Sequence, residues 1–260
     1  MRCDILTLFP EMVEPVLDQS MLKRAQDKGL FRVRVLNLRD FTSDRHQVAD
    51  DAPYGGGAGM VMKAEPFFRA VGTLRDEYGS RSSPHLILPS PQGRQFSQRV
   101  AEELANDERP VVFLCGHYEG IDERVRLGLQ PDEVSIGDYV LTGGELAALV
   151  MIDAAVRLIP GVVGDPESVL ADSFAESLLD FPHFTRPADV RGLQVPEVLL
   201  SGNHEAIRRW RRKASLRNTY VKRPDLLRDG ILSAEDRELL DEIVKEQREF
   251  CEVGRGGEPS

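Results

Sequence analysis

Cysteine is scarce in this 260-residue chain, and the three cysteines show no pairing by spacing. Cys3, Cys115 and Cys251 are odd in number and far apart, which argues against a disulfide framework or a cysteine-ligated zinc site. The five histidines are equally scattered. We therefore expect a cytoplasmic protein with reduced thiols and no structural metal.

Long hydrophobic runs are missing as well. No stretch reaches the roughly 18–20 apolar residues that a membrane-spanning helix needs. The nearest approach, Leu146–Val163, is interrupted by Asp153 and Arg157. Asp4 stands near the start, where a secretory signal would carry basic and then apolar residues. We expect neither a membrane span nor a signal peptide.

Common catalytic motifs are also absent. The chain has no P-loop and no G-x-S-x-G sequence. The glycine run Gly55–Gly59 has Met60 where the last glycine of a dinucleotide-binding motif belongs. His204 and Glu205 are followed by Arg208, where a zinc protease needs a second histidine. These absences disfavour hydrolase and dehydrogenase functions.

Hydrophobic patterning predicts an α/β fold in the first part of the chain. Short β-like runs alternate with amphipathic segments at Pro66–Tyr78, Ser97–Ala105 and Ile121–Leu129. Such alternation indicates a mostly parallel sheet with helices on both faces. The expected strands are Cys3–Phe9, Phe31–Asn37, His85–Leu88, Val111–Cys115 and Val134–Ile136.

The pattern changes after about residue 160. We expect a first domain at 1–163, a linker at 164–175 and a helical domain with a disordered tail at 176–260. Ser233 and Asp236 have capping-box spacing, which predicts a helix over Ala234–Phe250.

Three glycine-bearing loops follow predicted strands: Pro89–Gly93, Gly116–Gly120 and Gly137–Gly144. Ligands of parallel sheets usually bind at this edge, and glycine allows close backbone approach. No lysine or arginine lies in the loops, which favours a neutral or cationic ligand over phosphate, although each loop could be a plain turn. Thr142 and Glu145 have capping-box spacing, so a helix, apolar nearly all round and therefore buried, should span Glu145–Leu158.

Basic residues are concentrated in one segment of an otherwise acidic chain. The protein has 33 Lys and Arg against 43 Asp and Glu, a net charge of -10. Yet eight basic residues and no acid lie between Ala206 and Pro224. Ile207, Trp210 and Ala214 form an apolar seam that should face inward, leaving the bases exposed. We interpret these uncompensated charges as a phosphate-binding surface, the alternative being a plain solvated face.

Several long motifs resemble those of the bacterial tRNA (guanine-N1)-methyltransferase family. They are Asp50–Met60 (DDAPYGGGAGM), Gly116–Arg124 (GHYEGIDER), Ser135–Leu146 (SIGDYVLTGGEL), Asp172–Phe174 (DSF) and Pro182–Pro187 (PHFTRP). The resemblance implies a SPOUT methyltransferase domain with a deep C-terminal trefoil knot, followed by a small all-helical domain. It also implies a homodimer with its active site between subunits, with no DNA and no membrane as partner.

The implied reaction transfers a methyl group from S-adenosylmethionine to N1 of the tRNA guanine immediately 3′ of the anticodon. The implied catalytic residues are Asp172, as the base that deprotonates N1, and Arg157, with Mg²⁺ as a further requirement. The resemblance assigns the cofactor to Ser90, Pro91, Gly116, Tyr118, Glu119, Gly120, Ser135, Ile136, Gly137, Asp138, Tyr139, Val140, Leu141, Gly143 and Gly144. RNA binding falls to Arg208, Arg209, Arg211, Arg212 and Lys213.

Other interpretations stay open. From the residues alone, Asp172 is the first acid of a helix, and Arg157 pairs with Asp153 one turn earlier. Ala147 and Phe184 depart from the family's usual proline and tyrosine, which puts one RNA-side contact in doubt. A SPOUT enzyme acting on another RNA, or an RNA-binding protein without catalysis, would share most of these motifs.

Overall fold

The computed structural model describes residues 1–79, 83–164, 172–229 and 232–255. The chain forms two compact units, Met1–Pro166 and Glu167–Ser260. Most of the predicted linker, at 165–171, lies outside the described residues, as do 256–260 in the predicted tail.

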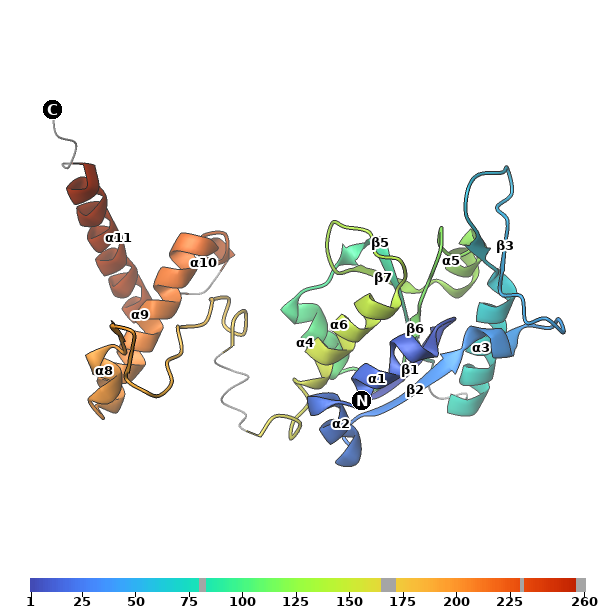
Figure 1. Ribbon diagram of the computed structural model, residues 1–260, viewed down its shortest axis with the longest axis horizontal. Coiled ribbons are helices and arrows are strands. Elements are labelled where there is room, and N and C mark those ends of the chain that lie inside the picture. The colour runs from blue at the N-terminus through green and yellow to red at the C-terminus, as the bar shows by residue number, and fades with distance from the viewer. Residues whose placement is uncertain (80–82, 165–171, 230–231, 256–260) are drawn as a thin grey trace. The chain divides into compact units, whose positions relative to one another are not determined.

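The first unit is built on a five-stranded parallel sheet in the order β2-β1-β6-β5-β7 (Figure 1). Every one of the five predicted strands takes part, so the α/β prediction is confirmed. The strands are β1 (Arg2–Thr7), β2 (Arg32–Asn37), β5 (His85–Gln95), β6 (Val111–Leu114) and β7 (Asp132–Ser135).

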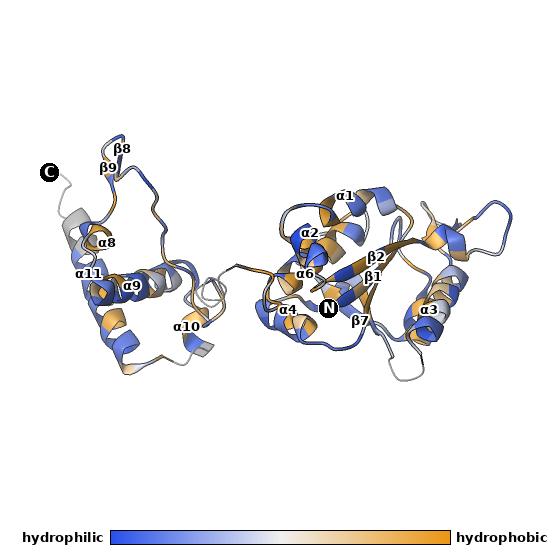
Figure 2. Cartoon of the chain, turned by 90° about the horizontal axis from the view of Figure 1, so that it is seen from below, coloured by the Kyte–Doolittle hydropathy of each residue, from blue (hydrophilic) through white to orange (hydrophobic). Residues whose placement is uncertain are grey.

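Helices cover both faces of this sheet, because side chains alternate between faces along each strand. In β1, Ile5 packs in one buried cluster and Leu6 in the other. The Ile5 face is covered by α1 (Glu14–Leu17), α2 (Ser20–Asp27), α4 (Gln98–Ala105) and α6 (Glu145–Val156). The Leu6 face is covered by α3 (Ala64–Tyr78), α5 (Glu123–Leu129) and the 3-10 turn η2 (Leu38–Phe41). A second 3-10 turn, η1 (Pro10–Met12), follows β1. Figure 2 shows orange, hydrophobic colour on the strands and blue, hydrophilic colour on the outer helices.

A small hairpin projects from the same unit. Strands β3 (Asp50–Asp51) and β4 (Val61–Met62) pair antiparallel, and the glycine run lies in the loop between them. Tyr54 in that loop is fully exposed. The hairpin is joined to the second predicted loop, because Met62 donates its backbone N–H to Gly120 O at 2.9 Å.

The second unit is mainly helical but contains one short hairpin, so the all-helical prediction is wrong at that place. Its strands are β8 (Asp189–Val190) and β9 (Leu193–Gln194), and Arg191 and Gly192 between them both have positive φ, as a tight hairpin turn requires. The helices are α8 (Glu197–Leu200), α9 (His204–Lys222), α10 (Leu226–Asp229) and α11 (Ala234–Arg255).

The core of this unit differs from the predicted seam on α9. Leu216 is fully buried with Leu239 and Ile243 of α11, whereas Ile207 and Trp210 are only half-buried. The predicted capping box of α11 is confirmed: Asp236 N–H donates to Ser233 Oγ (3.1 Å), and Ser233 N–H donates to Asp236 Oδ2 (3.0 Å). Within the described residues, no helix combines the length and hydrophobicity needed to cross a bilayer.

Candidate functional site

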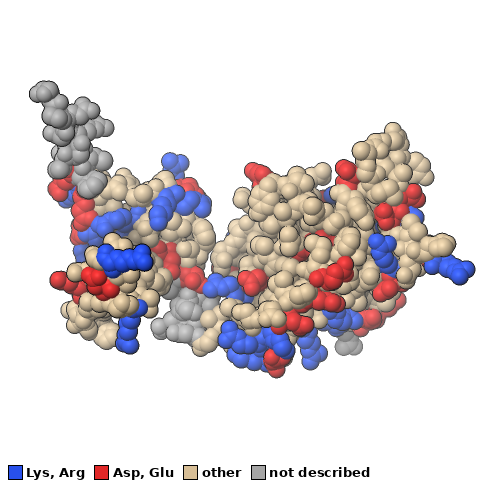
Figure 3. All heavy atoms as spheres, viewed as in Figure 1, with Lys and Arg blue, Asp and Glu red and all other residues tan. Residues whose placement is uncertain are grey.

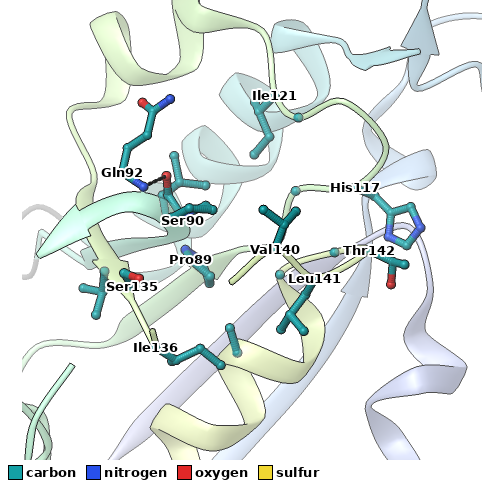
Figure 4. Close-up of a pocket in the computed structure, with 18 of the residues that line it drawn as sticks. Pro89, Ser90, Gln92, His117, Ile121, Ser135, Ile136, Val140, Leu141 and Thr142 are labelled. Carbon is teal, nitrogen blue, oxygen red and sulfur yellow. Dashed lines mark hydrogen bonds between the residues drawn. The ribbon is translucent and has the colours of Figure 1, made fainter. Parts of the chain in front are cut away.

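The three glycine-bearing loops meet at one cavity of about 290 Å³ beyond the ends of β5, β6 and β7. Figure 4 shows Ser90 of the first loop and Ser135 at the end of β7 on one side of Val140 and Leu141, with His117 and Ile121 on the other. Of the fifteen residues assigned to the cofactor by resemblance, fourteen line this cavity, and Asp138 does not. The prediction that the three loops form one pocket is therefore confirmed.

The first loop is a bulge inside β5 rather than a turn after it. Pro89 and Arg94 both pair with Val134 of β7, so the residues between them leave the ladder. Gly93 closes this bulge against β7: an added Cβ would lie 2.3 Å from the backbone carbon of Glu133 and the nitrogen of Val134. Only glycine fits, because a strand backbone cannot move aside as a side chain can. Within the bulge, Ser90 Oγ accepts the N–H of Gln92 at 3.2 Å.

The second and third loops are fastened to each other through their backbones. Gly144 N–H donates to Gly116 O at 2.8 Å, and His117 and Gly143 form an antiparallel bridge. A Cβ on Gly143 would lie 2.2 Å from Glu145 Oε2 and 2.4 Å from His117 Nδ1. The glycines therefore allow two loops to approach at a distance that side chains would prevent.

The cavity lining carries one basic and one acidic side chain, Arg126 and Glu119. The basic one does not come from the three loops, so the sequence analysis did not predict it. Arg126 reaches the lining from α5 and donates to Glu133 (3.0 Å) and Glu123 (3.1 Å), so its charge is paired. Glu119 also lines the cavity and is exposed. The lining thus offers main-chain groups and the carboxylate of Glu119, for which the described residues provide no ion pair. Such a lining suits a cationic ligand better than a phosphate.

Behind the loops lies a buried polar group that the sequence analysis missed. Thr7 Oγ1 at the end of β1 donates to Glu145 Oε1 at 2.6 Å, and both side chains are fully buried. Glu145 Oε2 lies 3.6 Å from His117 Nδ1, too far for a hydrogen bond, and neither atom has such a partner among the described residues. The predicted Thr142 cap is wrong: α6 begins after Gly144 with no side-chain cap, because Glu145 is held by Thr7. The spacing of Thr142 and Glu145 fits a capping box, and nothing in the neighbouring sequence indicates that Glu145 bonds to Thr7 instead.

The two predicted catalytic residues lie in different units. Arg157 is the half-buried C-cap of α6, and its N–H donates to Asp153 O at 3.3 Å. Asp172 lies in a bend at the start of the described part of the second unit. The expected helix after it is wrong: the chain turns there, with Phe174 at positive φ and its N–H bonded to Leu178 O at 2.8 Å.

Most basic residues of α9 are paired with acids. The sequence-based interpretation of them as uncompensated charges is therefore wrong. Acids of α11, with Glu205 and Glu176, pair with most of them, and Figure 3 shows red and blue side chains intermixed on this unit. The pairs are Arg208 with Glu205 and Glu235 (both 2.8 Å), Arg209 with Glu242 (2.6 Å), Arg212 with Asp236 and Glu176 (both 2.6 Å), and Lys213 with Glu242 (2.6 Å) and Glu246 (2.8 Å). The contact lies far along the chain, so the sequence of α9 alone could not reveal it.

Arg211 differs from its neighbours. Its guanidinium lies 4.9 Å from the ring centre of Phe181, and no ion pair to it is found within the described residues. Together with Trp210 it lines a second cavity, of about 560 Å³, within the second unit.

Comparison with known proteins identifies the family. Residues 1–229 match the family model described as tRNA (Guanine-1)-methyltransferase TrmD. The chain belongs to this family.

Three relatives, all named tRNA (guanine-N(1)-)-methyltransferase, align over nearly the whole chain. The protein of Dictyoglomus turgidum is 55% identical, covering 96% of this chain and 99% of the relative. That of Pelotomaculum thermopropionicum is 54% identical, with 96% and 99% covered, and that of Bacillus licheniformis is 56% identical, with 93% and 98% covered. The family match covers the three-loop cavity, Asp172 and all of α9, so both units carry family sequence.

Proposed function

We propose that this chain transfers a methyl group from S-adenosylmethionine to N1 of the tRNA guanine immediately 3′ of the anticodon. The observation that carries the proposal is the convergence of three main-chain-lined loops on one cavity in a member of this family. The guanine-N1 specificity follows the family, and the position in the tRNA follows the motif resemblance.

The charge of the cavity lining suits S-adenosylmethionine. Its charged lining is the exposed Glu119 and the paired Arg126, which complements a sulfonium cation. Tyr118 and Tyr139 add ring faces that attract cations. Gly93 and Gly143 lie where side chains would collide with backbone or with Glu145 and His117, which keeps the loops close enough to form the cavity. S-Adenosylmethionine supplies an electrophilic methyl carbon.

The chemistry of the target requires a base. Guanine N1 carries a proton at neutral pH and is a poor nucleophile until it is removed, a role that we assign to the Asp172 carboxylate. As the proton leaves, negative charge develops towards O6, and the Arg157 guanidinium stabilises it by charge-assisted hydrogen bonds. A guanine inside a stacked anticodon loop must turn out of the stack to reach these groups.

We include a homodimer with its active site between subunits in the proposal, as the motif resemblance implies, with one subunit supplying Asp172 to the other. Apolar side chains are exposed on α6 and the third loop: Leu146 is 47% and Val150 48% exposed, and Val140 is also exposed. Exposed apolar groups of this kind mark protein contacts. We include a deep trefoil knot in the proposal, formed by the segments that carry the second and third loops, as the motif resemblance implies.

The proposal also includes a magnesium requirement and a cytoplasmic location. Within the described residues, no three His, Cys, Asp or Glu side chains group closely enough to hold a metal ion, and no step is assigned to one. A requirement for Mg²⁺ in turnover remains an expectation from the family. The cytoplasm remains the proposed location, because that is where a bacterial tRNA enzyme meets its substrate.

The test is incubation of the purified chain with methyl-labelled S-adenosylmethionine and bulk tRNA, followed by mass identification of the modified nucleoside. We expect 1-methylguanosine next to the anticodon. Asp172→Asn should abolish transfer while leaving cofactor binding by calorimetry unchanged, whereas Glu176→Gln, a matched change four residues on, should retain transfer. Methylation of a ribose hydroxyl, or full activity of Asp172→Asn, would refute the assignment.

A further inference from the structure

The second cavity lies wholly within the helical unit and is lined by aromatic and basic side chains. Phe184 and Trp210 have ring centres 6.3 Å apart and planes tilted by 56°, so the rings touch without stacking on each other. Phe184 is 47% exposed and Trp210 is half-buried, which leaves ring surface open to a ligand. At about 560 Å³ the cavity is within the size range of small-ligand sites.

Charge at this cavity contrasts with the rest of α9. Arg208, Arg209, Arg212 and Lys213 are paired with carboxylates. Arg211 and Arg186 both line the cavity, and the described residues place no carboxylate within ion-pair distance of either. None of the described lining residues is acidic. The positive charge that remains available on this face is therefore concentrated beside the aromatic rings.

The ring beneath Arg211 is itself held in place. Phe181 lies 4.9 Å from the Arg211 guanidinium and 4.6 Å from the His183 ring, measured to ring centres. His183 Nε2 in turn lies 2.8 Å from Asp180 Oδ2. The contact with Phe181 therefore places the Arg211 guanidinium at the cavity lining.

From this arrangement we infer that the cavity binds one unstacked nucleotide of the substrate tRNA. Its base lies against Phe184 and Trp210, and the phosphate is contacted by Arg211. Aromatic faces accept a base of any sequence by stacking, and an adjacent unpaired guanidinium neutralises the backbone. A second copy of this chain is a poorer fit, because the rim carries two cations and the acidic chain would bring mixed charge to it. The inference rests on the proposed function only in naming tRNA as the partner.

The test uses the full chain and intact tRNA, with binding measured by fluorescence anisotropy over a range of salt. Phe184→Leu removes the ring but keeps apolar bulk, and should weaken tRNA binding about tenfold. Phe184→Tyr restores the ring and should bind as the parent does. Arg211→Gln should reduce the salt dependence by about one phosphate contact, whereas Arg208→Gln, a matched change of a paired residue, should alter affinity less than about twofold.

A coupling measurement identifies the occupant. Single abasic tRNAs are prepared for each unpaired position of the anticodon loop. One of these abasic tRNAs should bind the parent protein about tenfold more weakly than intact tRNA does. The same abasic tRNA and intact tRNA should bind Phe184→Leu equally well. Cofactor binding and the melting temperature of each variant check that the fold is unchanged.

Three results would overturn the inference. They are parent-like tRNA affinity of Phe184→Leu, additive losses at every abasic position, and dissociation of an oligomer by Phe184→Leu with unchanged tRNA affinity. The methyl-transfer assay on the parent protein is independent of all three. If the parent transfers methyl groups but Phe184→Leu shows no coupling to any abasic position, only the nucleotide-binding inference is refuted. If coupling is found but the parent transfers no methyl group, only the proposed reaction is refuted.

Discussion

The pair between Arg212 and Asp236 provides the sharpest test of the idea that the basic row of α9 is mainly structural. Arg212 Nε and Nη2 donate to the two oxygens of Asp236 at 2.6 and 2.9 Å, and Asp236 also accepts the Ser233 N–H. Asp236 is almost fully buried. Asp236→Asn keeps the size of the side chain but leaves one acceptor oxygen for three donors.

The expected loss follows from those contacts. A hydrogen bond to a charged group contributes about 1.5–3 kcal/mol, and a buried donor left without an acceptor costs about 1–3 kcal/mol. We therefore expect Asp236→Asn to lower the free energy of unfolding of the helical unit by about 3 kcal/mol. In a domain of fewer than 100 residues this corresponds to a fall in melting temperature of about 15 °C.

The assay is thermal unfolding of the full chain by circular dichroism, with tRNA affinity measured well below the transition. Ser233→Ala is the matched control, since it removes a cap bond without touching the ion pair and should cost about 1 kcal/mol. Because Asp236→Asn releases Arg212 from its carboxylate, tRNA binding should be unchanged or stronger. A melting temperature within 3 °C of the parent, or a loss of tRNA affinity in the folded variant, would refute the structural role.

Three further predictions concern stability. Gly93→Ala should lower it by about 2 kcal/mol and weaken cofactor binding, because the new Cβ meets the β7 backbone; urea unfolding and calorimetry measure both. Glu145→Gln should be neutral or stabilising in a thermal melt, since an amide can donate to His117 Nδ1, and a loss above about 1 kcal/mol would contradict this. Hydrogen bonds from Arg212 hold the pKa of Asp236 well below its usual value. The stability advantage of the parent over Asp236→Asn should therefore be full above about pH 4 and shrink as the pH falls, as pH-dependent melts would show.

The sheet could be predicted from the sequence because its signals are local. Strands such as β6 (Val111–Leu114) are short runs of β-branched and apolar residues, and the order of strands and helices along the chain specifies a parallel sheet. The edge at which Gly116 and Gly143 meet follows from the same rule, since the loops come after strands that end at one side. The sequence predicts a loop after the strand where the structure has the bulge at Gly93, because register depends on the neighbouring strand and not on the loop itself.

Errors in the prediction arose where a side chain has a distant partner. Glu145 fits a capping box with Thr142, but Thr7, 138 positions away, holds it instead. The helix expected after Asp172 is a different error, because a local turn forms there in which Phe174 N–H donates to Leu178 O. Spacing identifies which contacts are geometrically allowed, whereas packing decides which of them forms.

The charge on α9 shows how this limit bears on function. The sequence predicts a phosphate-binding surface at Ala206–Pro224, because this run holds eight bases and no acid. Four of the acids that pair with it, Glu235, Asp236, Glu242 and Glu246, come from α11, beyond residue 229 where the family match ends. A basic stretch inside a family match is therefore weak support for RNA contact until the pairing of its charges is known. Among the described residues Arg211 has no carboxylate within ion-pair distance, and a guanidinium without a carboxylate can exchange its counterion for a phosphate at little cost.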